Sequence, residues 1–304
     1  MTDPTGPASG ETASPGPVYP ADFADPHVLR EGSTYYAYAT NVGDSNVQVI
    51  SSPDLRTWTS LGDALPQLPP WAEARFTWAP EVCAYQGNYL LYYTVREPSS
   101  GRQAISVATA DRPEGPFVDR SATPLVCQLD RGGSIDPSPF VEGDDLYLLW
   151  KSDDNAFDKP SSLWGQRVTS GGLALVGRPT WLLSHDRPWE RPLIEAPAMV
   201  RSGDTYFLFY SANWWESPNY AIGYATGSGP LGPFDKVTRD GPWVSSRGRA
   251  AGTGGQAFFT DSEGDLRMAY HAWHHDRVGY PNGGARSLWV GRVRFVDGAP
   301  VLLD

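Results

Sequence analysis

The sequence predicts an all-β fold, a five-bladed β-propeller that forms one domain over residues 18–304. A phrase typical of a β-hairpin occurs five times, with a polar or small residue at its head, a short apolar strand, a turn containing glycine and an aromatic-rich strand. The heads Asp136, Glu195 and Gln256 follow at intervals of 59 and 61 residues, about the length of a four-stranded blade with its loops. Apolar residues do not recur at helical spacing over about a dozen residues, so no long helix is expected.

The five hairpin phrases account for the first two strands of each blade. In chain order they are ADPHVLREGSTYYAYAT from Ala24, APEVCAYQGNYLLYYTV from Ala79, IDPSPFVEGDDLYLLWK from Ile135, EAPAMVRSGDTYFLFYS from Glu195 and GQAFFTDSEGDLRMAYHAW from Gly255. The glycine in each turn permits the tight reversal between two antiparallel strands. We expect the first strand of each phrase to line the central channel.

The outer strands are predicted from a second pattern that follows three of the hairpins. Residues 51–58 (SSPDLRTW), 108–117 (ATADRPEGPF) and 224–234 (YATGSGPLGPF) each combine the end of a strand, a turn and a downstream aromatic residue. They predict the third strand and the start of the fourth. The chain also has 12 Trp, 15 Tyr and 11 Phe, which can fill the interfaces between wedge-shaped blades. Some of these rings are expected to line a site for a flat-faced ligand such as a sugar.

Charge and composition exclude several classes of partner. The net charge of −11 removes the electrostatic attraction on which binders of nucleic acid or anionic membranes depend. No segment is long and apolar enough to cross a bilayer. Residues 1–17 are rich in Pro, Gly, Ser and Thr and have no apolar stretch, so they predict a disordered tail and not a signal peptide. With two cysteines and no disulfide framework, a cytoplasmic location is expected.

Three of the five heads are acidic. These are Asp25, Asp136 and Glu195, each followed within two residues by a proline that favours an extended backbone. The starts of the inner strands converge on one mouth of a propeller, so the three carboxyl groups are expected to share a site. Each alone could be turn chemistry at a strand start, but three acids in register favour a shared function. Calcium-loop spacing of oxygen ligands is missing, so no metal is assigned.

A cluster of carboxylates in a partly dehydrated funnel raises at least one pKa, because the negative charges repel each other. Such a cluster can keep one carboxylic acid protonated beside another that stays ionised. Glycoside hydrolysis needs this combination, an acid for the departing oxygen and a base for water, with about 6.5 to 9.5 Å between the carboxyl groups of an inverting pair. A glycosidase is therefore the first hypothesis.

The chain resembles glycoside hydrolase family 43, whose members are five-bladed β-propellers that act on arabinan, arabinoxylan and xylan fragments. The resemblance spans residues 18–304 and rests on FADPHVLREGSTYYAYAT, TWAPEV, GSIDPSPF, IEAPAMV and GGARSLWVGRV in this order. It implies that Asp25 is the general base, Glu195 the general acid, and Asp136 the carboxylate that raises the pKa of the acid and orients it. It also implies inversion at the anomeric carbon.

Further residues are candidates for substrate binding. Trp78 offers a flat face for a sugar ring, although it could equally pack between blades. Arg286 matches an arginine that relatives direct at sugar hydroxyls, the alternative being a solvated strand arginine. Asn41, at the end of the first hairpin, is a third candidate for contact with the substrate.

The fifth phrase departs from the family pattern. Many relatives have Gly-His at its head, with the histidine in the central channel and sometimes beside a metal ion, whereas this chain has Gln256 there. An amide is a poorer metal ligand than imidazole, so no cofactor is expected to be required and a central structural calcium is doubtful. Gln256 can still hydrogen-bond to a sugar or water. His271, on the next strand, is the remaining histidine for the channel, as a substrate contact or as a structural group.

The substrate is expected to be a small oligosaccharide containing arabinose or xylose. The absence of an appended binding module favours an enzyme that trims short chains. We rank an exo-acting α-L-arabinofuranosidase first, a β-D-xylosidase second and an endo-arabinanase third. A sugar-binding propeller without turnover is the alternative from another class, and a phosphorylase or transferase lacks support because no Gly-rich phosphate loop or Lys cluster is present.

Overall fold

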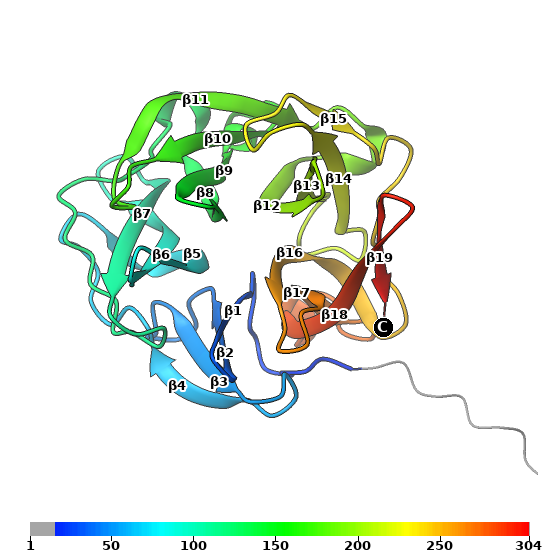
Figure 1. Ribbon diagram of the computed structural model, residues 1–304, viewed down its shortest axis with the longest axis horizontal. Coiled ribbons are helices and arrows are strands. Elements are labelled where there is room, and N and C mark those ends of the chain that lie inside the picture. The colour runs from blue at the N-terminus through cyan, green and yellow to red at the C-terminus, as the bar shows by residue number, and fades with distance from the viewer. Residues whose placement is uncertain (1–15, 304) are drawn as a thin grey trace, which may run out of the picture.

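Five antiparallel sheets surround a central axis, as the computed structural model of residues 16–303 shows (Figure 1). The predicted five-bladed β-propeller is therefore confirmed. The innermost strand of each sheet, β1, β5, β8, β12 or β16, faces the central opening, and later strands lie progressively outward. The predicted tail, 1–17, lies outside the described residues except for Gly16 and Pro17.

Each blade is built from consecutive strands, so the sheets contain no crossover. Blade 1 consists of β1 (His27–Glu31), β2 (Thr34–Ala39), β3 (Gln48–Ser52) and β4 (Thr59–Asp63). Blade 2 consists of β5 (Glu73–Tyr85), β6 (Asn88–Glu97) and β7 (Arg102–Ala110). Blade 3 consists of β8 (Ser134–Glu142), β9 (Asp145–Ser152), β10 (Ser162–Val168) and β11 (Leu175–Ser184).

The last two blades follow the same plan. Blade 4 consists of β12 (Ile194–Ser202), β13 (Thr205–Ala212), β14 (Ala221–Gly227) and β15 (Phe234–Lys236). Blade 5 consists of β16 (Ala250–Thr260), β17 (Leu266–His274), β18 (Ser287–Val296) and β19 (Ala299–Leu303). Helical structure in residues 16–303 is limited to four short 3₁₀ turns: η1 (Leu129–Arg131), η2 (Asp154–Phe157), η3 (Pro188–Glu190) and η4 (Tyr280–Asn282). None of these helices is long or apolar enough to span a membrane.

Blade 2 has three strands where the sequence predicted the start of a fourth. After β7 the chain makes only isolated bridges with that strand, between Thr109 and Val118, Ile105 and Val126, and Gln103 and Gly133. Pro124, which lies between the bridged residues Val118 and Val126, has no N–H to donate to a continuous ladder. Phe117 instead donates its N–H to the carbonyl oxygen of Ala64 at 2.7 Å and buries its ring between blades 1 and 2.

The hydrophobic core consists of five clusters, each between two neighbouring blades. For example, Tyr38 of blade 1 packs in one cluster with Leu91 and Tyr93 of blade 2, while Phe209 of blade 4 packs with Met268 of blade 5. Wide aromatic side chains fill these wedge-shaped gaps, as the composition predicted. The ring closes between blades 5 and 1, where Val18 donates its N–H to Leu288 at 2.9 Å.

Candidate active site

A cavity of about 310 Å³ opens on the central axis at the head of the inner strands. All three predicted carboxylic acids line it, together with two of the predicted binding residues, Trp78 and Arg286. Nine further residues complete the lining: Thr40, Ile135, Lys151, Asp153, Asn155, Leu193, Trp214, Trp215 and Tyr220. The inner strands therefore bring together residues that lie far apart in the sequence.

The three acids are not all in register, which corrects the sequence-based alignment. Ile135 pairs with Lys151 in blade 3, and Glu195 pairs with Ser211 in blade 4. The equivalent of Asp136 is thus Ala196, and Glu195 lies one residue earlier. The equivalent residue in blade 5 is likewise Gly255 and not Gln256, because Gly254 pairs with His271. Alignment on Pro26, Pro80, Pro137 and Pro197, in place of the acids, would have given the correct register.

The residues in register share an unusual backbone conformation, with positive φ at all five positions: Asp25 (51°), Ala79 (43°), Asp136 (56°), Ala196 (49°) and Gly255 (59°). A non-glycine residue rarely adopts this conformation, so it must be held by its surroundings. The strand bulges there, and Asp25 and Asp136 direct their side chains into the cavity. In blade 4 the positive-φ residue is Ala196, and it is the preceding residue, Glu195, whose side chain lines the same cavity.

Asp25 is held ionised by the groups around it. Its carboxylate accepts a hydrogen bond from the Thr40 hydroxyl at 2.8 Å and lies 3.5 Å from the Arg286 guanidinium. Burial alone would raise the pKa of Asp25, but the positive charge of Arg286 and the hydrogen bond from Thr40 hold it well below the ordinary carboxyl value. A carboxylate that remains ionised can act as a base.

The surroundings of Asp136 and Glu195 favour a protonated carboxyl group, in contrast to those of Asp25. Burial and the negative charge of Glu195 raise the pKa of Asp136 well above its ordinary value. Glu195 accepts a hydrogen bond from the Tyr220 hydroxyl at 2.8 Å, and its other oxygen lies 3.4 Å from the Lys151 ammonium group. The pair therefore resists carrying two negative charges, and a proton bound there belongs to both carboxyl groups.

Aromatic side chains form the walls of the cavity, and two of them were missed by the sequence-based prediction. Trp214 and Trp215 lie on the loop between β13 and β14, and Trp214 is 46% exposed. The guanidinium of Arg286 lies 4.7 Å from the centre of the Trp215 ring. The sequence shows the two adjacent tryptophans, but whether this loop reaches the cavity depends on its tertiary contacts. Trp78 enters the cavity from blade 2.

The other predicted binding residues lie outside the cavity lining. Gln256 is buried, accepts from the Ser211 hydroxyl at 2.7 Å and donates to the Ala196 carbonyl oxygen at 2.7 Å. His271 is also buried, and its Nδ1 accepts the N–H of Asp25 at 3.0 Å. Asn41 donates its backbone N–H to Thr77 at 2.9 Å. Gln256 and His271 are thus placed to connect blades around the axis.

The residues of the channel do not fit a calcium site centred on Gln256. Its amide oxygen and nitrogen are both engaged in hydrogen bonds within the protein. Burial lowers the pKa of His271, so the ring is neutral, and its Nδ1 is occupied by the N–H of Asp25. Two other groups of potential ligands, within the described residues, lie on blade 5: His274, His275 and Asp276, and Asp261, Glu263 and Asp265. Neither group contains a residue of the cavity.

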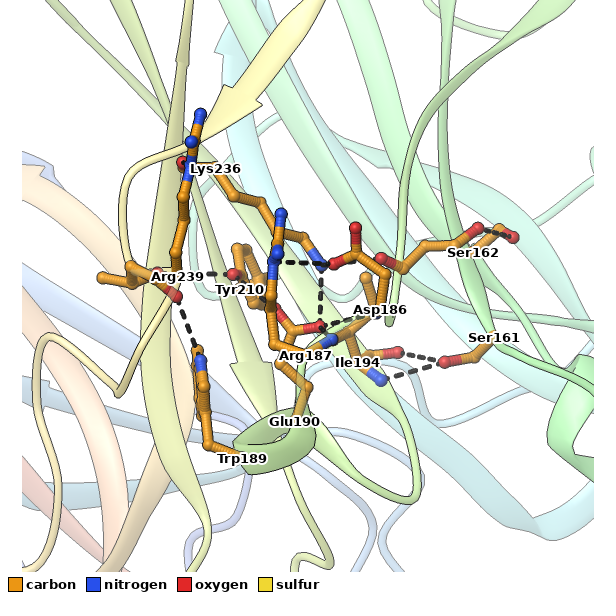
Figure 2. A network of polar contacts seen from close by, with 12 residues as sticks. Ser161, Ser162, Asp186, Arg187, Trp189, Glu190, Ile194, Tyr210, Lys236 and Arg239 are labelled. Atoms are coloured by element: carbon orange, nitrogen blue, oxygen red, sulfur yellow. Dashed lines mark hydrogen bonds and ion pairs between the residues drawn. The ribbon is translucent and has the colours of Figure 1, made fainter.

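A buried polar network supports the strand that carries Glu195 (Figure 2). The ammonium group of Lys236 lies 2.7 Å from Glu190 and 2.8 Å from Asp186, and Glu190 also accepts from the Tyr210 hydroxyl at 2.8 Å. The carbonyl oxygen of Glu190 accepts the N–H of Asn213 at 3.1 Å. The network thereby fixes the segment before Glu195 and the start of the loop that carries Trp214 and Trp215.

Comparison with known proteins agrees with this geometry. A family profile described as "Glycosyl hydrolases family 43" matches residues 14–300. The chain belongs to this family. A crystal structure described as a thermostable family-43 glycoside hydrolase is 30% identical, covers 93% of each chain and superposes with a TM-score of 0.83. The resemblance inferred from the sequence is thus confirmed, and this family 43 member is a glycoside hydrolase.

Two relatives of this family 43 chain are named for different activities. One, from Aspergillus niger, is named "Beta-D-galactofuranosidase xynD"; it is 27% identical over 86% of this chain and 77% of its own length. The other, from Aspergillus clavatus, is named "Probable arabinan endo-1,5-alpha-L-arabinosidase A"; it is 27% identical over 95% of this chain and 94% of its own length. Membership of the family therefore leaves the sugar and the mode of attack to be decided by the cavity.

Proposed function

We propose that the protein is an exo-acting α-L-arabinofuranosidase that hydrolyses short oligosaccharides with inversion. The observation that carries this proposal is the size of the cavity that holds the three carboxyl groups. At about 310 Å³ it lies at the small end of the range for ligand pockets, which suits one terminal sugar unit better than the interior of a polymer. Trp78 from blade 2 and the exposed Trp214 from blade 4 offer flat faces for sugar rings, whereas Trp215 packs against Arg286 and Trp273.

In this proposal Asp25 is the general base. Its carboxylate stays ionised beside Arg286 and accepts a proton from a water molecule that attacks the anomeric carbon. The hydrogen bond from Thr40 fixes the orientation of the carboxylate. The N–H of Asp25 is anchored on His271, so the histidine acts as a positioning residue.

Glu195 is the general acid, and Asp136 keeps a proton available to it. Two carboxyl groups that cannot both ionise hold one proton between them near neutral pH. Glu195 delivers this proton to the departing glycosidic oxygen, so the bond to the anomeric carbon breaks with the electron pair on that oxygen. Tyr220 donates a hydrogen bond to Glu195 and supports the carboxylate that remains. No step of this sequence needs a metal or a cofactor.

The names of these two relatives favour a furanoside over a xylopyranoside as the substrate. One relative is named for β-D-galactofuranose and the other for arabinan. The rings of β-D-galactofuranosides and α-L-arabinofuranosides have the same configuration and differ only in the length of the side chain at the ring. A binding site for galactofuranose therefore differs from one for arabinofuranose only where it contacts the side chain of the sugar ring. We keep β-D-xylosidase and endo-arabinanase as alternatives.

The test is hydrolysis of a panel by the wild type and by the variants Glu195→Gln and Asp25→Asn. The panel contains the para-nitrophenyl α-L-arabinofuranoside, β-D-galactofuranoside and β-D-xylopyranoside, with arabino- and xylo-oligosaccharides and linear arabinan. We expect release of arabinose from chain ends, with the inverted anomer seen first by proton NMR. Each variant should lose roughly a hundred- to ten-thousandfold in kcat/KM on oligosaccharides.

The leaving group separates the two roles. Para-nitrophenolate departs with little help from an acid, so Glu195→Gln should lose much less on the nitrophenyl glycoside than on the oligosaccharide. Asp25→Asn should lose similar factors on both, because activation of water is needed in each case. Binding of arabino-oligosaccharides without turnover, unchanged in Glu195→Gln, would instead support a sugar-binding propeller. Release of internal fragments from arabinan would support the endo-acting alternative.

A further inference from the structure

Each blade places one side chain at the edge of the axial channel, opposite the residue that precedes the positive-φ position. This side chain comes from the second strand or, in blade 1, from the residue directly after that strand. In chain order these five side chains are Thr40, Thr94, Lys151, Ser211 and His271. Four of them accept the N–H of the positive-φ residue in the next blade, at 3.1 Å for Thr40, 3.0 Å for Thr94, 2.9 Å for Ser211 and 3.0 Å for His271. These hydrogen bonds join blade 1 to 2, 2 to 3, 4 to 5 and 5 to 1.

Blade 3 is the exception, because a lysine ammonium group cannot accept a hydrogen bond. The N–H of Ala196, which would need that acceptor, is instead donated to the Asp136 carboxylate at 2.9 Å. Lys151 directs its ammonium group to Asp153 at 2.9 Å and to Glu195 at 3.4 Å. The substitution of a cation for a hydroxyl thus creates one contact with the carboxyl pair of the active site, to Glu195, and a second contact with the neighbouring Asp153.

The burial of Lys151 makes this arrangement unusual. The chain contains only three lysines, Lys151, Lys159 and Lys236, against 21 arginines. The side chain of Lys151 is 2% exposed and lines the cavity. Burying a long cation costs desolvation energy and side-chain entropy, so a hydroxyl like that of Thr94 would be the cheaper way to join the blades. Nothing in blade packing accounts for the lysine.

We propose that Lys151 is a positioning residue that orients the Glu195 carboxyl group and sets the highest pH at which the Asp136–Glu195 pair keeps its proton. This inference rests on the proposed function for its catalytic consequence. The positive charge of Lys151 opposes the rise in the pKa of Asp136, so it favours the ionised pair and stabilises the carboxylate left after proton transfer. The enzyme therefore stops working at a lower pH than a threonine at this position would allow.

The charged and titratable groups around Lys151 keep its ammonium group charged. They are Asp153 after β9, Asp136 on β8, Glu195 on β12, Tyr220 before β14 and, across the cavity, Asp25 with Arg286. Burial would lower the pKa of Lys151, but the charges of Glu195, Asp153 and Asp136 raise it, so the lysine stays charged. Asp25 is already balanced by Arg286, which leaves Lys151 as the cation facing the carboxyl pair.

The test compares Lys151→Met, which keeps the length and removes the charge, with Lys151→Thr, which restores the hydroxyl of blades 1 and 2. Lys159→Met is the control for the loss of one positive charge. Lys159 lies outside the cavity lining and outside the buried network around Lys236. The pH profile of kcat/KM is measured on the hydrolysed oligosaccharide of the panel. The protonated-carboxyl band is titrated by infrared difference spectroscopy, with Glu195→Gln to assign it.

We expect both Lys151 variants to shift the alkaline limb and the infrared titration to higher pH by about 1 to 3 units, with a lower kcat at the wild-type optimum. Lys159→Met should match the wild type. An unchanged infrared titration in folded Lys151→Met and Lys151→Thr would overturn the inference, whether or not hydrolysis is seen. A shifted infrared titration in a protein that hydrolyses nothing would support the role of Lys151 and remove the proposed function.

Discussion

Removal of the Lys236 ammonium group should be one of the most destabilising single changes in this protein. The group is almost fully buried and lies 2.7 Å from Glu190, 2.8 Å from Asp186 and 2.6 Å from the carbonyl oxygen of Ser184 (Figure 2). Glu190 is completely buried, so in Lys236→Met its carboxylate would lose its cation without gaining access to water. Breaking a buried ion pair by removing one partner costs about 3 to 5 kcal/mol.

The lower end of this range is the better expectation. Glu190 would still accept hydrogen bonds from the Tyr210 hydroxyl and from the N–H groups of Asp186 and Arg187. A loss of about 3 kcal/mol corresponds to a fall in Tm of roughly 6 to 12 °C, at about 2 to 4 °C per kcal/mol for a large domain. Urea unfolding followed by tryptophan fluorescence measures the free energy directly.

The matched comparison is the double variant Lys236→Met, Glu190→Gln. A neutral glutamine no longer needs the cation, so the double variant should be more stable than the sum of the two single losses predicts, by more than about 1 kcal/mol. A single loss below about 1 kcal/mol for Lys236→Met, or strict additivity in the cycle, would refute the reasoning that this pair is coupled and desolvated.

Three further outcomes follow from the cavity. Arg286→Met removes the cation that lowers the pKa of Asp25, so the pKa of Asp25 rises. The acidic limb of the pH profile of kcat/KM should then move to higher pH by about 1 unit or more. An unmoved limb would contradict the assignment of Asp25 as the base. Trp214→Ala should raise KM for arabino-oligosaccharides about fivefold, from the loss of about 1 kcal/mol of ring contact, with little change in Tm because the side chain is 46% exposed. Prolonged treatment with EDTA should leave kcat/KM unchanged, because Gln256 uses its amide within the protein; a loss of activity restored by calcium would contradict this.

The elements that the sequence predicted well are those with a local signal. The five hairpins follow from Gly-containing turns between apolar strands, and each formed where the phrase occurs. The third strands also followed their pattern. The fourth strand of blade 2 did not form, since outer strands make few contacts and the segment after its turn contains Pro124, which has no N–H for the ladder.

The candidate site was predicted in part, for reasons that differ between residues. Asp25, Asp136 and Glu195 carry a strong signal, because an acid followed within two residues by a proline recurs at the start of strands that must converge. The shift of Glu195 by one residue was invisible in a pattern aligned on acids. Gln256 and His271 were recognised as channel residues, but their hydrogen bonds direct them to the joints between blades. Lys151 carries no local signal at all.

The sequence by itself determined the number of blades, the all-β class and the identity of the three acids, because each depends on a repeated local phrase that any blade must contain. Only the tertiary structure decided which neighbours those acids have. Whether Asp25 meets Arg286, and whether Glu195 meets Lys151, depends on contacts between residues 261 and 44 positions apart. Such contacts set the charge of each carboxyl group through distance and burial, and neither quantity exists until the ring is closed.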